Sequence, residues 1–161
     1  MKMKLHHVAL VILVLIVGSC SSEPLQIDEG EVIAEAENVK EVEQELLGII
    51  NDHRTALGQT SLEFSAVAYE YANTHTDYMI SKGSLSHDNF SSRASGISST
   101  VNAEAVAENV AKDYDSAIEA FQGWLNSTNH KKTMEGDFTN TAVSVKKDLN
   151  GNFYYTQLFY K

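Results

Sequence analysis

Two stretches beyond the first forty residues carry apolar side chains every three or four positions. The first runs from residue 42 to residue 57 and ends at Gly58. The second runs from residue 64 to residue 79, with Ser65 as a candidate N-cap and Gly83 as a stop signal. We expect two consecutive amphipathic helices, because this spacing places the apolar residues on one helix face.

The middle of the chain has weaker patterns. Residues 83–103 are rich in Gly, Ser and Asn and lack periodicity, which predicts a loop region. Residues 101–112 are ambiguous, although their alanines favour a helix. Ser116 and Glu119 have the spacing of a capping box, so a third helix is expected to begin there and to end near Asn126.

The end of the chain changes to the pattern of β-strands. A short turn is expected over residues 129–136. Residues 142–145 and 153–159 are rich in β-branched and aromatic side chains, and the Asn150-Gly151 pair between them is a hairpin signal. Helices followed by a terminal hairpin predict an α+β fold.

The first nineteen residues resemble an export signal. Lys2 and Lys4 precede an apolar run over residues 8–17 that is short for a membrane span. The run is followed by Gly-Ser-Cys, and with the preceding valine these residues resemble a bacterial lipobox ending at Cys20. We expect Cys20 to be lipidated and the protein to be tethered to a membrane. The alternative is an ordinary signal peptide with an incidental cysteine.

Charge and cysteine content limit the possible partners and cross-links of the protein. The net charge is −10, and the 12 basic residues are scattered, which argues against nucleic acid as a partner. Cys20 is the single cysteine, so no internal disulfide can form. Residues 20–40 are acidic and poor in aromatic side chains, so we expect a solvated tether there and one domain over residues 41–161.

Three motifs in a fixed order carry a family resemblance. They are Ser86-His87 with Phe90 and Arg93, then Ala107-Glu108-Asn109, then Trp124-x-x-Ser127-x-x-His130. This order resembles the bacterial branch of the CAP superfamily, the cysteine-rich secretory, antigen 5 and pathogenesis-related 1 proteins, also called SCP domains. Only a glycine of the family pattern is replaced, by Ala107. The sequence Asn-Asp-His-Arg at residues 51–54 and residues 155–159 extend the match.

The resemblance implies a three-layer α-β-α sandwich with a small antiparallel sheet, and an extended or irregular piece around Glu108. It also implies a cleft lined by His87, Glu108 and His130, with Ser127 where many relatives have a second acid. His53 and His75 lie on apolar helix faces, so we interpret both as neutral core residues.

Three roles remain open for these side chains from the residues alone. His87, His130 and Glu108 could hold zinc. They could act as a general acid and base, or they could be a hydrogen-bonded cluster that fixes the loops. We expect Arg93 to pair with a carboxylate or with loop carbonyls.

The functional expectation is a lipid-anchored binding module of the bacterial cell envelope, facing the periplasm or the cell exterior. Its expected ligand is a metal, a lipid or a protein. The alternatives are a metal-assisted hydrolase or protease and a structural envelope protein with a vestigial cleft. No G-x-S-x-G or H-E-x-x-H motif supports hydrolysis.

Overall fold

The computed structural model describes residues 36–161. The predicted signal peptide, the lipobox with Cys20 and most of the acidic tether lie outside the described residues. Among the helices formed by residues 36–161, none combines the length and apolar character needed to cross a membrane.

A four-stranded sheet forms the middle layer, with the strand order β1-β3-β4-β2. The two long strands β3 (Asn140–Lys147) and β4 (Phe153–Tyr160) form the predicted hairpin. Strand β2 (Val106–Lys112) pairs antiparallel with β4, so the ambiguous stretch is extended. The two-residue strand β1 (Glu63–Phe64) pairs parallel with β3. The sheet is therefore mixed, whereas an antiparallel sheet was expected.

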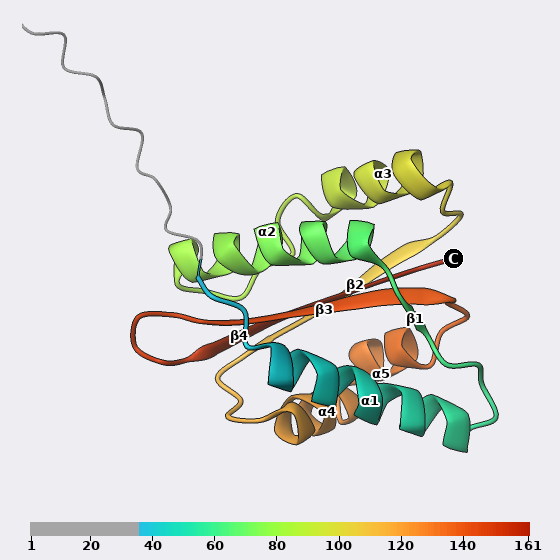
Figure 1. The fold of residues 1–161 in the computed structure, drawn as a ribbon, viewed down its shortest axis with the longest axis horizontal. Coiled ribbons are helices and arrows are strands. Elements are labelled where there is room, and N and C mark those ends of the chain that lie inside the picture. The colour runs from blue at the N-terminus through green and yellow to red at the C-terminus, as the bar shows by residue number, and fades with distance from the viewer. Residues whose placement is uncertain (1–35) are drawn as a thin grey trace, which may run out of the picture. The chain divides into compact units, whose positions relative to one another are not determined.

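Helices cover both faces of this sheet (Figure 1). Helices α2 (Ala66–Lys82) and α3 (Phe90–Val101) lie on one face. Helices α1 (Lys40–Ala56), α4 (Ala117–Leu125) and α5 (Thr128–Met134) lie on the other. This arrangement confirms the α+β class and the three-layer α-β-α sandwich.

The predicted helix ends are confirmed where the sequence carries capping chemistry. Ser65 Oγ accepts the backbone N–H of Ala68 at the start of α2. Gly83 ends that helix with a φ of +70°, a conformation that costs glycine little. Ser116 Oγ accepts the N–H of Glu119 at the start of α4, as the capping-box spacing predicted.

Two segments expected to be irregular are helical, and both depend on tertiary contacts. Helix α3 lies within residues 83–103, and its N-cap Asn89 makes no capping hydrogen bond. Its serines favour helix weakly, but Arg93 and Ile97 on its inner face are buried. Helix α5 replaces the expected turn over residues 129–136, and Met134 at its end is fully buried. In both segments, the burial of side chains stabilises a helix that the local sequence favours only weakly.

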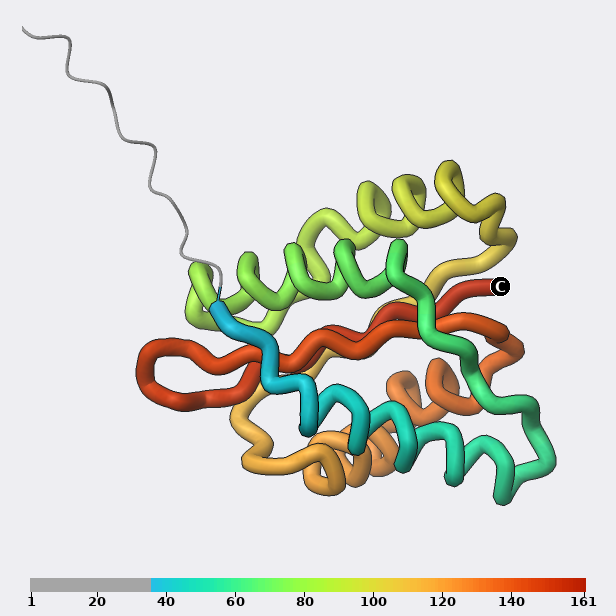
Figure 2. The backbone as a smooth tube through the Cα atoms, viewed as in Figure 1, coloured from blue at the N-terminus to red at the C-terminus, as the bar shows by residue number. Residues whose placement is uncertain are grey.

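The chain is attached to the sheet before α1 begins. The Ala36 N–H donates to Asp77 on α2, and the Val39 N–H donates to Val145 O on β3. Asn38 forms an isolated bridge with Lys146. Figure 2 shows the backbone entering beside α2 and crossing the edge of the sheet into α1. Residues 36–39 therefore cover part of the outer edge of β3.

Arg54 joins the end of α1 to the end of α5. Its side chain is buried, and all four of its hydrogen bonds go to backbone carbonyls. Nη1 donates to Met134 O at 2.7 Å and Gly136 O at 2.8 Å. Nη2 donates to Phe138 O at 3.2 Å, and Nε donates to Thr60 O at 3.0 Å. One guanidinium thus satisfies the carbonyls that a short helix and its following turn leave free.

We expect Arg54→Met to lower the free energy of unfolding by about 3 kcal/mol, because several buried carbonyls lose their donor. Urea denaturation of both proteins measures the difference. Lys132 is an exposed cation on the same α5 segment, and Lys132→Met is the matched control. Equal effects of the two substitutions would contradict the role given to Arg54.

Candidate functional site

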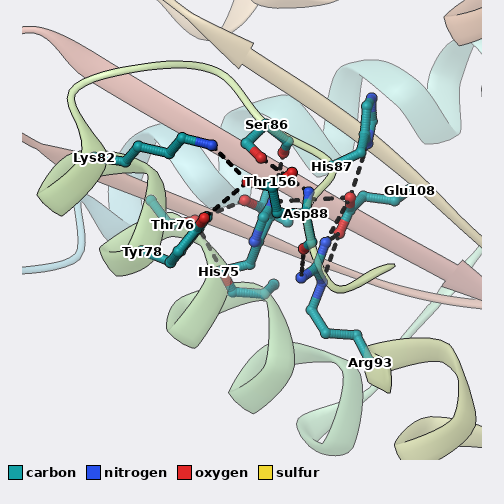
Figure 3. Close-up of polar contacts among 11 residues, drawn as sticks. His75, Thr76, Tyr78, Lys82, Ser86, His87, Asp88, Arg93, Glu108 and Thr156 are labelled. Atoms are coloured by element: carbon teal, nitrogen blue, oxygen red, sulfur yellow. Dashed lines mark hydrogen bonds and ion pairs between the residues drawn. The ribbon is translucent and has the colours of Figure 1, made fainter. Parts of the chain in front are cut away.

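The centre of the site is the carboxylate of Glu108 on β2. Its side chain is 2% exposed, although β2 is an edge strand. Arg93 donates to both oxygens, from Nε to Oε2 and from Nη2 to Oε1, each at 2.9 Å. His87 Nδ1 lies 2.9 Å from Oε1 (Figure 3). Glu108 is therefore a buried anion whose oxygens are both engaged.

Arg93 connects this carboxylate to the loop that carries His87. It is buried on the inner face of α3, and its Nη1 donates to Asp88 O at 2.6 Å. The expectation that Arg93 would pair with a carboxylate or with loop carbonyls is confirmed, because it does both. The bidentate pair fixes α3 and the preceding loop relative to β2.

The loop is also held from the side of α2. The Asp88 carboxylate accepts hydrogen bonds from Tyr78 OH at 2.8 Å and from Lys82 Nζ at 2.5 Å. These donors, with Lys82 the stronger cause, hold the pKa of Asp88 well below its usual range. The backbone around His87 is thus fixed from two helices.

His87 is fixed in orientation but remains open to solvent. Its side chain is 55% exposed. A carboxylate can only accept, so Nδ1 carries the proton of the Glu108 hydrogen bond in the neutral ring. The lone pair of a neutral His87 then lies on Nε2, which is free to accept a hydrogen bond or to bind a metal ion.

His75 extends the site into the core. Its Nε2 donates to Ser86 O at 2.7 Å and lies 3.8 Å from Glu108 Oε1. Burial lowers the pKa of His75 against the opposing effect of Glu108, so the ring is neutral near pH 7. The expected core position of His75 is confirmed, because the residue is buried. Its contact with Glu108 was missed, since an apolar helix face does not reveal which carboxylate lies opposite.

His130 approaches the site from α5. Burial, and then the positive charge of a protonated His87, lower the pKa of His130. The backbone carbonyl of His130 accepts Asn109 Nδ2 at 3.1 Å, so the residue after Glu108 positions α5. The structure therefore joins the side chains of His87 and Glu108, and it joins His130 to the residue after Glu108 through its backbone carbonyl.

Ser127 occupies the N-cap position of α5 but makes no side-chain capping hydrogen bond. No hydrogen bond joins Ser127 to His130 within residues 36–161. Ser127 instead lines a separate depression that contains no imidazole, with Tyr114, Glu119, Gln122, Gly123 and Asn126.

The side chains provide an incomplete donor set for zinc. Within residues 36–161, no group of three or more His, Cys, Asp or Glu side chains is arranged to hold a metal ion. Glu108 is engaged by Arg93 and His87, so it would orient a ligand and not bind a metal directly. Nε2 of His87 is the nitrogen that the site leaves open to a metal, and the remaining positions would need a further side chain, water or atoms of another molecule.

We expect Glu108→Gln to lower the free energy of unfolding by about 3 kcal/mol, because it leaves Arg93 as a buried, uncompensated cation. Thermal or urea denaturation measures the change. Glu70 is exposed on α2, and its carboxylate takes part in none of the hydrogen bonds or ion pairs of residues 36–161, so Glu70→Gln is the control. A Glu108→Gln protein as stable as that control would refute a buried ion pair.

The lowered pKa values of His75 and His130 predict acid destabilisation. The unfolded chain binds protons at these rings near the ordinary histidine value of about 6.5, whereas the folded chain binds them only at lower pH. Below about pH 6.5 the unfolded state therefore holds more protons, and the free energy of unfolding falls. Urea denaturation between about pH 7.5 and 5.5 tests this. His75→Gln should show a smaller fall, and an unchanged fall would exclude His75 as a contributor.

Comparison with known proteins identifies the family to which the domain belongs. Residues 47–159 match the family described as "CAP: Cysteine-rich secretory protein family". The "Uncharacterized membrane protein YlbC" of Bacillus subtilis (strain 168) is 30% identical over 123 residues, which are 74% of this chain and 34% of that protein. The chain thus spans about a third of the length of this relative.

Solved structures from bacteria share the fold. An extracellular protein containing an SCP domain from Bacillus anthracis has a TM-score of 0.67 at 26% identity, over 76% of this chain and 41% of that one. An outer surface protein from Borrelia burgdorferi has a TM-score of 0.70 at 19% identity, over 78% and 98% of the two chains. The family match covers most of the chain and all three motifs of the site, and the chain belongs to the CAP family of cysteine-rich secretory proteins.

Proposed function

We propose that this CAP domain is an extracytoplasmic binding module whose ligand is held by the imidazoles of His87 and His130. The observation that supports this most is the contrast between Glu108 and His87. A carboxylate that is 2% exposed holds an imidazole that is 55% exposed. The fold thus keeps a solvent-facing ring in one orientation.

A cluster with only a structural role would not need that exposure. His87 gains little from burial, yet Arg93, Asp88 and the end of α2 all act on the loop that presents it. The result is a preoriented acceptor nitrogen that faces solvent. Preorientation lowers the entropy cost of binding, which is the physical reason to maintain such a geometry.

A divalent metal is one form that this ligand can take. His87 and His130 would hold the ion, and Glu108 would orient His87 through Nδ1. A bound ion would supply a positive centre with open coordination positions. Because only two protein ligands are present, the bound species would be a metal together with water or with a molecule that completes its coordination.

The proposed location follows from the beginning of the chain and from the names of the relatives. One relative is called a membrane protein, one an extracellular protein and one an outer surface protein. We propose export through residues 1–19 and a lipid anchor on Cys20, with the acidic tether separating the domain from the lipid surface. A lipid or protein ligand would then meet the domain outside the cytoplasm.

Hydrolysis receives no support from the described residues. A serine nucleophile needs a base within hydrogen-bond reach. Ser127 and His130 form no such pair, and Ser127 lines a depression away from an imidazole. The binding module is therefore the better account of the site.

Calorimetric titration of Zn²⁺ into the chain from Ser21 to Lys161 tests the metal form of the proposal. We expect a Kd of about 10–100 μM, as suits two imidazole ligands, and at least about a tenfold loss in His87→Ala and in His130→Ala. His53 lies on α1 and contacts Glu135, so His53→Gln is the matched control.

Zinc binding that is unchanged in both alanine variants would refute the imidazole pair as the metal site. An absence of binding in the unaltered chain would refute the metal form. The remaining ligands would then be a lipid or a protein partner, for which the same two variants are the probes.

A further inference from the structure

A second buried carboxylate lies at the opposite edge of the sheet from Glu108. Glu43 on α1 is 8% exposed and accepts three hydrogen bonds. Asn38 Nδ2 and the Val145 N–H donate to Oε1 at 2.6 Å and 2.9 Å, and Tyr69 OH donates to Oε2 at 2.8 Å. Three donated bonds suit an ionised carboxylate, because that form only accepts. Burial and this carboxylate raise the pKa of Tyr69 to about 12, so the phenol keeps its proton.

No cation of residues 36–161 is in ion-pair contact with this carboxylate. Glu108 has Arg93, but the three partners of Glu43 are a side-chain amide, a phenol and a backbone N–H. No Lys, Arg or His of these residues forms an ion pair with Glu43. A buried ion is costly unless an opposite charge contacts it, so a carboxylate without an ion pair requires an explanation.

A pocket of about 380 Å³ opens beside Glu43. Both partners of the Glu43–Tyr69 hydrogen bond line it, and apolar side chains and two aromatic rings form much of the rest. Phe64 on β1 is 58% exposed, and its ring centre lies 5.6 Å from that of Tyr69, with the planes at 58°. The complete lining is Lys40, Glu43, Gln44, Leu47, Phe64, Tyr69 and Val143.

We infer that this pocket binds a small organic ammonium ion. The Glu43 carboxylate supplies the opposite charge, and the faces of Phe64 and Tyr69 attract a cation through their quadrupoles. Leu47 and Val143 offer apolar surface to the carbon groups of the ligand. A hydrated metal ion would gain nothing from the aromatic and aliphatic walls, whereas an alkylammonium ion would use all of them.

The charge of Lys40 indicates which kind of ammonium ligand fits this pocket best. It is exposed at the first position of α1 and lines the same pocket, three residues before Glu43. Its charge repels a simple cation but attracts an anionic group on the same molecule. The best ligand is therefore a zwitterion, with the ammonium group at Glu43 and the anionic group at Lys40.

The competing explanation is that Glu43 only closes the edge of the sheet. Its hydrogen bond to the Val145 N–H satisfies a backbone donor that β1 is too short to reach. This role needs an acceptor but neither a negative charge nor aromatic rings in the pocket. The two explanations therefore differ in whether the charge of a ligand matters.

The test is an NMR titration of the uniformly ¹⁵N-labelled chain from Ser21 to Lys161 with choline and with its neutral isostere, 3,3-dimethylbutan-1-ol. We expect choline to shift the amide signals of Phe64, Val143 and Val145 with a millimolar Kd. The isostere should bind at least about fivefold more weakly, because it has the shape without the charge.

Three variants measure how much each side chain contributes to ligand binding. Phe64→Leu changes an exposed ring, so it should fold and weaken choline binding about threefold or more. Glu43→Gln removes the negative charge and should weaken it about tenfold or more. Lys40→Gln should strengthen choline binding but weaken phosphocholine binding, because Lys40 repels the cationic choline and attracts the phosphate group of phosphocholine.

Equal affinity for choline and its isostere would overturn the inference, since the pocket would then recognise only apolar shape. So would an absence of shifts up to about 50 mM choline, which excludes a millimolar Kd. Unchanged choline binding in Phe64→Leu would also overturn it, and this result does not depend on whether Glu43→Gln folds.

Discussion

The ion pair between Glu108 and Arg93 is the interaction on which the site depends. Glu108 lies on an edge strand and would normally face water, but α3 covers it and removes its hydration. Arg93 replaces that hydration with a planar fork that matches both oxygens. Because the same guanidinium holds Asp88 O, the position of α3 and the orientation of His87 follow from one charge pair.

This dependence explains why the sequence predicts some elements and misses others. Helices α1, α2 and α4 have an apolar period and local capping residues, such as Ser65 and Ser116, so their own sequence is sufficient. Helix α3 has neither, and it forms because Arg93 and Ile97 are buried against distant partners. Such partners are separated along the chain, and a periodic pattern cannot identify them.

Like the helices, the candidate site was predictable from the sequence only in part. The order of the family motifs singled out His87, Glu108 and His130, and the structure shows a direct contact between His87 and Glu108 and a contact of the His130 carbonyl with Asn109. Their roles were not predictable from the sequence. Whether Glu108 binds a ligand or orients a ring depends on how many of its oxygens are engaged, and the sequence does not specify the bidentate contact from Arg93. The contact of His75 with Glu108 was hidden for the same reason.

The strap formed by residues 36–39 has a mechanical consequence. Any tension transmitted along the preceding chain reaches the folded domain first at the bond between Ala36 and Asp77. The contacts of Asn38 with Glu43 and of Val39 with Val145 are loaded next. These bonds are in series and can open one after another. Opening of the strap would release Glu43 from its donor Asn38, whereas the Glu108–Arg93 pair lies at the other edge of the sheet. A pull on residue 36 would therefore act at the edge of the sheet formed by β3, whereas His87 is held by Glu108 at the opposite edge, on β2.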